Sequence, residues 1–135
     1  MVVVDTNVVV AGLITADEAS PVARILDGML VVAFPFVVSE ALLAEYRSVL
    51  VRPVLRKLHG LTVAQVDVIL TDLAQNAIVL VPGAGAPAPN AGVQFLWDLL
   101  VARPDMILVT GDKRLLNDPG MRGRVITPRD FTTAP

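Results

Sequence analysis

The amino-acid sequence predicts an α/β protein in which a mostly parallel central sheet of four or five strands lies between helices. Short apolar runs of strand length alternate with longer segments of helical period along its 135 residues. The first run, Val2–Val4, does not alternate with polar residues, which is typical of a strand buried on both faces. A chain of this length suits one domain, and we predict a single domain over residues 1–135.

The first half of the chain carries helix-start signals between its apolar runs. Helical spacing runs from Asn7 to about Leu13, and Ser20 followed by Pro21 is a typical N-cap and first helical residue. We expect the helix that begins there to end at Gly28. The further elements predicted up to residue 76 are a strand over 30–34, an amphipathic helix over 39–50, a short helix over 53–58 and a helix over 62–76.

The second half continues the same alternation. Thr62 and Gln65 have the spacing of a capping box at the start of the helix over 62–76. Residues 82–92 are rich in proline and glycine and predict a loop, which lacks the Lys-Ser/Thr ending of a phosphate-binding loop. The remaining predicted elements are a strand over 78–81, a helix over 95–102, a strand over 106–110, a short strand over 124–127 and a C-terminal turn.

The composition excludes several classes of protein. Because the chain has no cysteine, disulfides and thiolate metal sites are excluded. The longest apolar run, over residues 29–38, has about half of the ~20 residues that a membrane span needs. No basic segment typical of a signal peptide precedes the first strand, so we expect a cytoplasmic protein.

Hydrophobic residues make up 54% of the chain, more than we expect one small core to bury. The surplus predicts a homodimer or a protein partner, and we expect the apolar face of the helix over 39–50 or of the helix over 62–76 to take part in the interface. The net charge of −2 gives no overall attraction to nucleic acid, so such binding would depend on a local basic patch.

Two of the predicted strands are followed by an acid. Asp5 follows the first strand and Asp112 follows the strand over 106–110, and open parallel sheets bind ligands at the carboxyl ends of their strands. Glu45, in the helix over 39–50, is a third candidate. Carboxylates without histidine or cysteine suit Mg²⁺ or Mn²⁺, which can promote hydrolysis of a phosphodiester. The alternatives are that the aspartates are helix N-caps and that Glu45 lies on a solvated face.

Three segments of the chain resemble a known family. They are Asp5-Thr6-Asn7, SEALLAEYRSVL over residues 39–50 and LVTGDKRLL over residues 108–116. In this order and spacing they are similar to the PIN domain, and more narrowly to bacterial PIN-family proteins described as toxin components of toxin–antitoxin systems. The resemblance covers nearly the whole chain. It implies a three-layer fold, a Mg²⁺- or Mn²⁺-dependent endoribonuclease with a site of three or four acids, an RNA substrate and an antitoxin partner.

The resemblance also assigns roles to residues. It implies that Asp5 is the first acid of the metal site, Glu45 the second and Asp112 the last. Asn7 and Thr110 match the polar residues that usually flank this site, and we expect them to contact the substrate. In the implied mechanism Asp5 and Asp112 hold the metal, while Glu45 is a ligand or orients the attacking water.

The chain departs from the family pattern at one acid. The family's third acid falls on Val93 or Gln94 here, and neither side chain can bind Mg²⁺ as a carboxylate does. Asp98 lies one helical turn beyond Gln94, on the same helix face, and could reach the ion through water. We therefore include Asp98 among the candidate catalytic residues.

Basic and aromatic residues supply further candidates. Lys113 and Arg114, directly after Asp112, are predicted to contact RNA phosphates. Trp97 is interpreted as a core residue rather than a platform for base stacking. His59 is interpreted as a residue at a helix C-terminus, where it favours the helix dipole. A second basic group, which is either an RNA groove or a solvated face, is formed by Arg52, Arg56 and Lys57.

The sequence therefore predicts a metal-dependent endoribonuclease with two rivals. The first rival is a catalytically weakened PIN-like module that acts by binding RNA or a protein. The second is a metal-dependent phosphohydrolase of the HAD type, which has an aspartate two residues after the aspartate of its first strand. Because Asn7 stands at that position, the sequence argues against the second rival.

Overall fold

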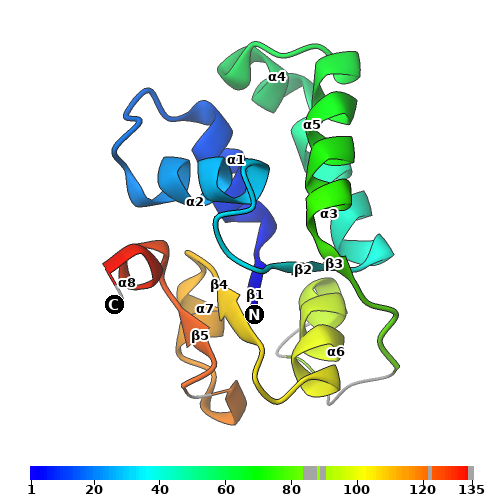
Figure 1. Ribbon diagram of the computed structural model, residues 1–135, viewed down its shortest axis with the longest axis vertical. Helices are drawn as coiled ribbons and strands as arrows, with labels where there is room; N and C mark the ends of the chain where they lie inside the picture. The colour runs from blue at the N-terminus through cyan, green and yellow to red at the C-terminus, as the bar shows by residue number, and fades with distance from the viewer. Residues whose placement is uncertain (84–87, 89–90, 122, 134–135) are drawn as a thin grey trace.

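The strands form a parallel arrangement through the middle of the molecule. The structure is a computed structural model that describes residues 1–83, 88, 91–121 and 123–133 (Figure 1). A three-stranded sheet has the order β1-β4-β5, and β2 pairs with β3, all in parallel. The strands of the described residues are β1 (Val2–Val4), β2 (Val37–Val38), β3 (Ile78–Val79), β4 (Ile107–Val109) and β5 (Val125–Ile126).

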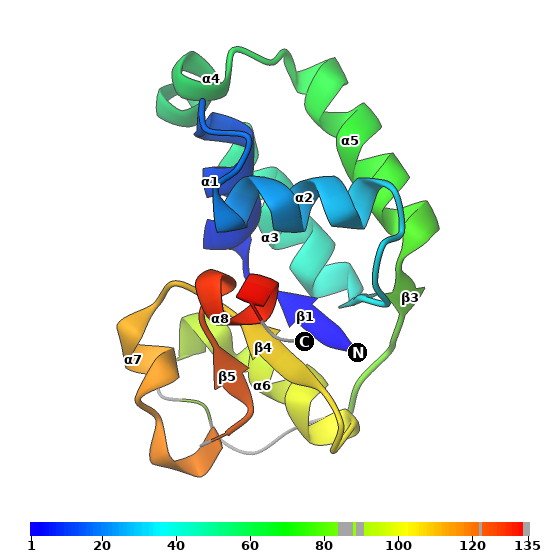
Figure 2. The same ribbon diagram turned by 60° about the vertical axis from the view of Figure 1, so that its left-hand side comes forward.

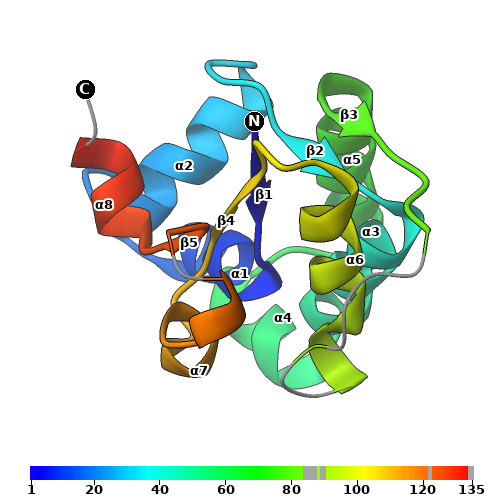
Figure 3. The ribbon, with the colours of Figure 1, turned by 90° about the horizontal axis from the view of Figure 1, so that it is seen from below.

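A parallel bridge between Val2 and Phe36 joins the two sets of strands. Figure 3 shows the resulting order β5, β4, β1, β2 and β3 across the molecule. The prediction of a mostly parallel sheet of four or five strands between helices is therefore confirmed. The prediction of a strand over 78–81 is met by β3, which is shorter than predicted.

The helices begin at the capping signals that the sequence carries. Ser20 and Ser39 each accept a backbone N–H of the helix they cap, and Thr62 and Gln65 form both bonds of the capping box. Described helices are α1 (Thr6–Ile14), α2 (Pro21–Leu30), α3 (Glu40–Leu50), α4 (Pro53–His59), α5 (Val63–Asn76), α6 (Gln94–Ala102), α7 (Lys113–Leu116) and α8 (Pro128–Thr133). Within the described ranges, no helix has the length and apolar character needed to cross a membrane.

The prediction of a strand over 30–34 is wrong. Helix α2 continues through Gly28 to Leu30, because Gly28 serves close packing rather than a helix end: a Cβ there would lie 2.6 Å from Phe34 Cε1. Val32 then turns the chain in the left-handed region, at a φ of 56°. The strand lies beyond Pro35, where the apolar side chains are buried against β1.

The helices pack on one continuous core. Helix α1 packs on α2, α3 packs on α5, and α6 packs against β4. The predicted C-terminal turn is the helix α8, which lies beside α2 (Figure 2). Phe131 of α8 meets Phe34 edge to face at 5.0 Å. The core interpretation of Trp97 is confirmed, because the side chain is buried.

The apolar faces expected to form an interface are used inside the chain. Leu42, Tyr46 and Leu50 of α3 are buried, as are Val66 and Leu73 of α5. An interface with another chain would therefore have to use other residues. Residues 84–87 and 89–90, which fall in the loop predicted over 82–92, lie outside the described residues.

Candidate active site

The carboxyl edge of the sheet brings residues from distant parts of the chain side by side. Val4 pairs with Val109, and the bridge from Val2 to Phe36 sets the register of β1 against β2. One residue beyond the strands, this register places Asp5 between Thr110 and Ser39. Neighbouring strands lie about 5 Å apart, so these positions are adjacent. The backbone N–H of Asp5 donates to Val109 O at 2.9 Å, which extends the pairing to the edge.

Asp5 is a buried carboxylate held by several donors. Its exposed fraction is 8%, and it is the N-cap of α1. Its Oδ1 accepts the backbone N–H of Thr6 at 2.7 Å. Its Oδ2 accepts a hydrogen bond from the Thr110 hydroxyl at 2.7 Å and another from Asn7 Nδ2 at 3.3 Å. Asp5 is therefore a helix N-cap, as the alternative predicts, and this role leaves open the hypothesis that it also binds a metal ion.

Asn7 and Thr110 tie the two strand ends together. Asn7 Nδ2 also lies 3.3 Å from Thr110 Oγ1, and Asn7 Oδ1 accepts the backbone N–H of Gly111 at 3.2 Å. Thr110 Oγ1 in turn accepts the backbone N–H of Asp112 at 3.0 Å. The two residues predicted to flank the site thus lie beside Asp5, and their contact with substrate stays a prediction.

Asp112 lies at the same edge and is paired with Arg114. It is the N-cap of α7, with Oδ1 accepting the backbone N–H of Arg114 at 2.9 Å. The Arg114 guanidinium reaches both carboxylate oxygens, with Nη2 3.1 Å from Oδ2. This hydrogen-bonded cation lowers the pKa of Asp112. The Arg114 side chain is 75% exposed, so the pair is one that solvent screens and a competing cation could replace. Lys113 is exposed beside it.

Glu45 comes to this edge on a helix that is anchored to β1. The Glu45 side chain is half-buried on α3. Its neighbour Tyr46 is fully buried and donates its hydroxyl to the carbonyl oxygen of Val4, the last residue of β1. Burial, followed by the charge of Asp5, raises the pKa of Tyr46. Tyr46 therefore remains a neutral donor and fixes α3 against the strand that carries Asp5.

The charges of the other two predicted acids, Asp112 and Glu45, act on Asp5. Burial raises the pKa of Asp5 above its ordinary value of 3.8, and the hydrogen bonds from Thr110 and Thr6 partly offset this rise. The negative charges of Asp112 and Glu45 raise the pKa of Asp5 further. A cation bound among these carboxylates would relieve their repulsion.

The carboxylate oxygens at this edge have the chemistry of ligands for a hard divalent metal ion. Mg²⁺ and Mn²⁺ prefer carboxylate oxygens, which Asp5, Glu45 and Asp112 supply. Within the described ranges, no three acidic, histidine or cysteine residues stand together as a ready-made metal-binding group. Binding at this edge would therefore require Asp112 to exchange Arg114 for the ion, with local movement of the three carboxylates.

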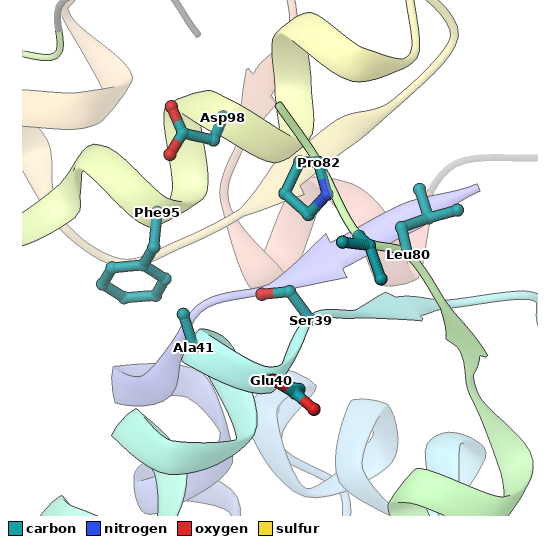
Figure 4. Close-up of a pocket in the computed structure, with 8 residues that line it drawn as sticks. Ser39, Glu40, Ala41, Leu80, Pro82, Phe95 and Asp98 are labelled. Atoms are coloured by element: carbon teal, nitrogen blue, oxygen red, sulfur yellow. The ribbon is translucent and has the colours of Figure 1, made fainter. Parts of the chain in front are cut away.

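Asp98 lies in a pocket beside these residues. As predicted, it shares a helix face with Gln94, whose Nε2 donates to Asp98 Oδ1 at 3.0 Å. Asp98 lines the pocket together with Ser39 and Phe95 (Figure 4). Val93, where the family's third acid could fall, is the N-cap of α6. A catalytic role for Asp98 stays a prediction.

Sequence reasoning missed two residues that shape this edge. Tyr46 stands on the apolar face of the helix over 39–50, and its place directly after Glu45 is the one local signal that it could reach the strand end. Ser39 was recognised as the start of a helix but not as the neighbour of Asp5, because that position follows from the strand register. His59 has a structural role, since its ring bonds Leu50 O at 2.9 Å and the N–H of Leu61 at 3.0 Å.

Comparison with known proteins adds one result. The family model described as PIN domain matches residues 1–114. These residues include Asp5, Glu45, Asp98 and Asp112. The curated proteins searched contain no match to the chain.

Proposed function

Because this chain belongs to the PIN-domain family, whose members are in general nucleases, we propose that it is a Mg²⁺- or Mn²⁺-dependent endoribonuclease. The buried Asp5 is the observation that carries this proposal. Its pKa is raised by burial and by the charges of Asp112 and Glu45. Desolvated carboxylates that repel one another favour a bound cation, and hydrolysis of phosphodiesters is chemistry that such an ion promotes.

In this proposal the chain fixes the site before substrate arrives. Asp5, Glu45 and Asp112 would hold the ion, which when bound supplies an acidified water and neutralises charge on the phosphodiester. Thr110 and Asn7 hold the Asp5 carboxylate in one orientation. Arg114, once released from Asp112, lies where it can contact an RNA phosphate, as can Lys113.

We also propose that the protein acts in the cytoplasm as the toxin component of a toxin–antitoxin system. Three exposed apolar residues support an interface with an antitoxin or a second copy: Val54 and Leu58 on α4, and Val68 on α5. Light scattering at high micromolar concentration tests the second copy. A well-behaved monomer would count against the homodimer.

The rival is a PIN-like module that binds RNA or protein without cleaving. Two observations favour it: the family's third acid is absent at Val93 and Gln94, and Asp112 is engaged by Arg114. Both would weaken ion binding. The missing acid removes a ligand and a compensating charge, and the pairing with Arg114 occupies the carboxylate of Asp112.

Cleavage of a mixed pool of single-stranded RNA distinguishes the two functions. The wild-type protein should cut the pool with Mn²⁺ or Mg²⁺ and not with EDTA, and Asp5→Asn should abolish cutting because it removes a charged ligand. Asp72→Asn is the matched control, since Asp72 is an exposed acid on α5. Single-stranded DNA of the same sequence tests the restriction to RNA.

Each outcome of this experiment decides between the functions. Metal-dependent cleavage by the wild type and Asp72→Asn, absent in Asp5→Asn, supports the ribonuclease. Equal cleavage by all three proteins would come from a contaminating nuclease or from a different site. RNA binding without cleavage at any metal concentration would support the binding module.

A further inference from the structure

A pocket of about 250 Å³ opens at the carboxyl edge of the sheet, beside the acids of the proposed metal site. Its walls come from three elements. Ser39 follows β2, Leu80 and Pro82 follow β3, and Phe95 and Asp98 project from α6 (Figure 4). The pocket volume is below the roughly 300–1,000 Å³ of sites for drug-sized ligands, which suits a single heterocycle.

The register of the sheet sets the place of this pocket relative to Asp5. The bridge from Val2 to Phe36 aligns Asp5 with Ser39 on neighbouring strands. The pairing of Val38 with Val79 continues the same line from Ser39 to Leu80. Because neighbouring strands lie about 5 Å apart, the pocket begins one strand away from Asp5. A phosphate at Asp5 and a base of an adjoining nucleotide in the pocket would therefore be neighbours along one RNA strand.

The lining of the pocket favours an uncharged group with hydrogen-bond donors. The carboxylate of Asp98 makes the pocket unfavourable for a phosphate. In Figure 4, Asp98 and Phe95 extend from α6 on the same side of the pocket, and the Glu40 carboxylate points away from both. Asp98 accepts a hydrogen bond from Gln94 Nε2 through Oδ1 at 3.0 Å, so its carboxylate already acts as a hydrogen-bond acceptor at this pocket. Phe95 adds an aromatic ring, on which bases of single-stranded nucleic acids commonly stack.

We propose that this pocket binds an unpaired nucleobase carrying an exocyclic amino group, in single-stranded RNA whose neighbouring phosphate lies at Asp5. The proposal rests on the ribonuclease function for its choice of ligand. A carboxylate accepts hydrogen bonds from the amino groups of adenine, cytosine and guanine. Uracil presents a carbonyl on each side of its N–H, and both carbonyls would be repelled by Asp98. Asp98 is thus assigned to base selection rather than to the ion.

Equilibrium binding in EDTA tests the pocket apart from catalysis. Fluorescently labelled octamers of uridine, with or without one central adenosine, cytidine or guanosine, are titrated with the full-length protein by fluorescence anisotropy. The wild type should bind the amino-bearing octamers about tenfold more tightly than the all-uridine octamer. Asp98→Asn should remove this preference, because the near-isosteric amide presents a donor as well as an acceptor. Phe95→Leu should weaken all octamers without changing their order.

The matched control is again Asp72→Asn, which should behave as the wild type. Equal binding of all octamers by the wild type, or a preference that survives in Asp98→Asn, would overturn the base pocket whether or not RNA is cleaved. A preference lost in Asp98→Asn, in a protein that cleaves no RNA with Mn²⁺, would support the pocket and refute the ribonuclease. Neither binding nor cleavage of any octamer at millimolar protein would refute both.

Discussion

The carboxyl edge of the sheet has two halves of different construction. The charged half, made by Asp5, Asn7, Thr110 and Asp112, is a network in which hydrogen bonds join residues more than a hundred positions apart. The pocket half, made by Ser39, Leu80, Pro82, Phe95 and Asp98, is a hollow in which apolar side chains stand beside the hydroxyl of Ser39 and the carboxylate of Asp98. In the functions proposed above, the charged half would hold the ion and the pocket half would select the base.

The charged half carries an electrostatic cost that the pocket half does not. The ionised form of Asp5 is disfavoured by the burial of its side chain and by the charges of Asp112 and Glu45, which together raise its pKa. Thr6 adds to the cost, because its buried hydroxyl has no hydrogen-bond partner among the described residues. Ionisable groups with unfavourable surroundings are common at functional sites, and a cation bound here would offset part of the electrostatic cost of ionised Asp5.

The largest expected effect is a loss of RNA cleavage without a loss of base preference. Asp112→Asn should lower kcat for RNA by at least about hundredfold, because it removes a charged ligand from the site. It should leave the order of preference among the octamers intact. Asparagine is an equally good N-cap, and the exposed ion pair with Arg114 contributes little to stability, so the fold should persist. Single-turnover cleavage with Mn²⁺ measures the change, and a loss of less than about fivefold would remove Asp112 from the machinery.

A second prediction concerns the support of the charged half. Tyr46→Phe removes the hydroxyl that binds the carbonyl of Val4, and we expect the free energy of unfolding to fall by roughly 1–3 kcal/mol. If Tyr46 positions Asp5 against Glu45, kcat should fall about tenfold with little change in KM. Leu50→Val, one turn along α3, is the matched control for lost stability alone. Equal kcat in the two variants would mean that the Tyr46 hydroxyl contributes to stability alone.

The sequence predicts the charged half better than the pocket half, for a physical reason. Asp5 and Asp112 each follow a buried apolar run, and such local patterns reveal strand ends directly. The neighbourhood of Asp5 and Ser39 depends on strand register, which is set by pairing between distant segments and not by either segment alone. The strand misplaced at 30–34 has the same cause, since Val31 and Val32 are apolar but are 74% and 54% exposed. Their place outside the core depends on the packing of Phe34 over Gly28.

A third prediction uses the titration of Asp5. Because its pKa is raised above 3.8, the folded protein keeps a proton between the two pKa values that the unfolded chain has lost. The contribution of this carboxyl to the free energy of unfolding therefore declines as the pH rises through that interval. Glu45→Gln should lower the pKa of Asp5, because it removes one repelling charge. Carbon-detected NMR of the carboxyl group measures both values, and an unchanged pKa would place Glu45 outside the charged half.

The smallest expected effect tests where the missing family acid would fall. Val93 is the N-cap of α6 and makes no side-chain capping bond, so an aspartate there would cap the helix, at the loss of some apolar packing. If this position faces the ion, Val93→Asp should tighten Mn²⁺ binding several-fold in calorimetry, because it adds a ligand and a negative charge. Val93→Ser supplies the cap without the charge and separates the two effects. Equal Mn²⁺ affinity in the two variants would mean that Val93 does not face the ion, and Gln94→Asp would then test the neighbouring register. Tighter binding in Val93→Asp alone would show that this site lost an acid without losing the geometry to use it.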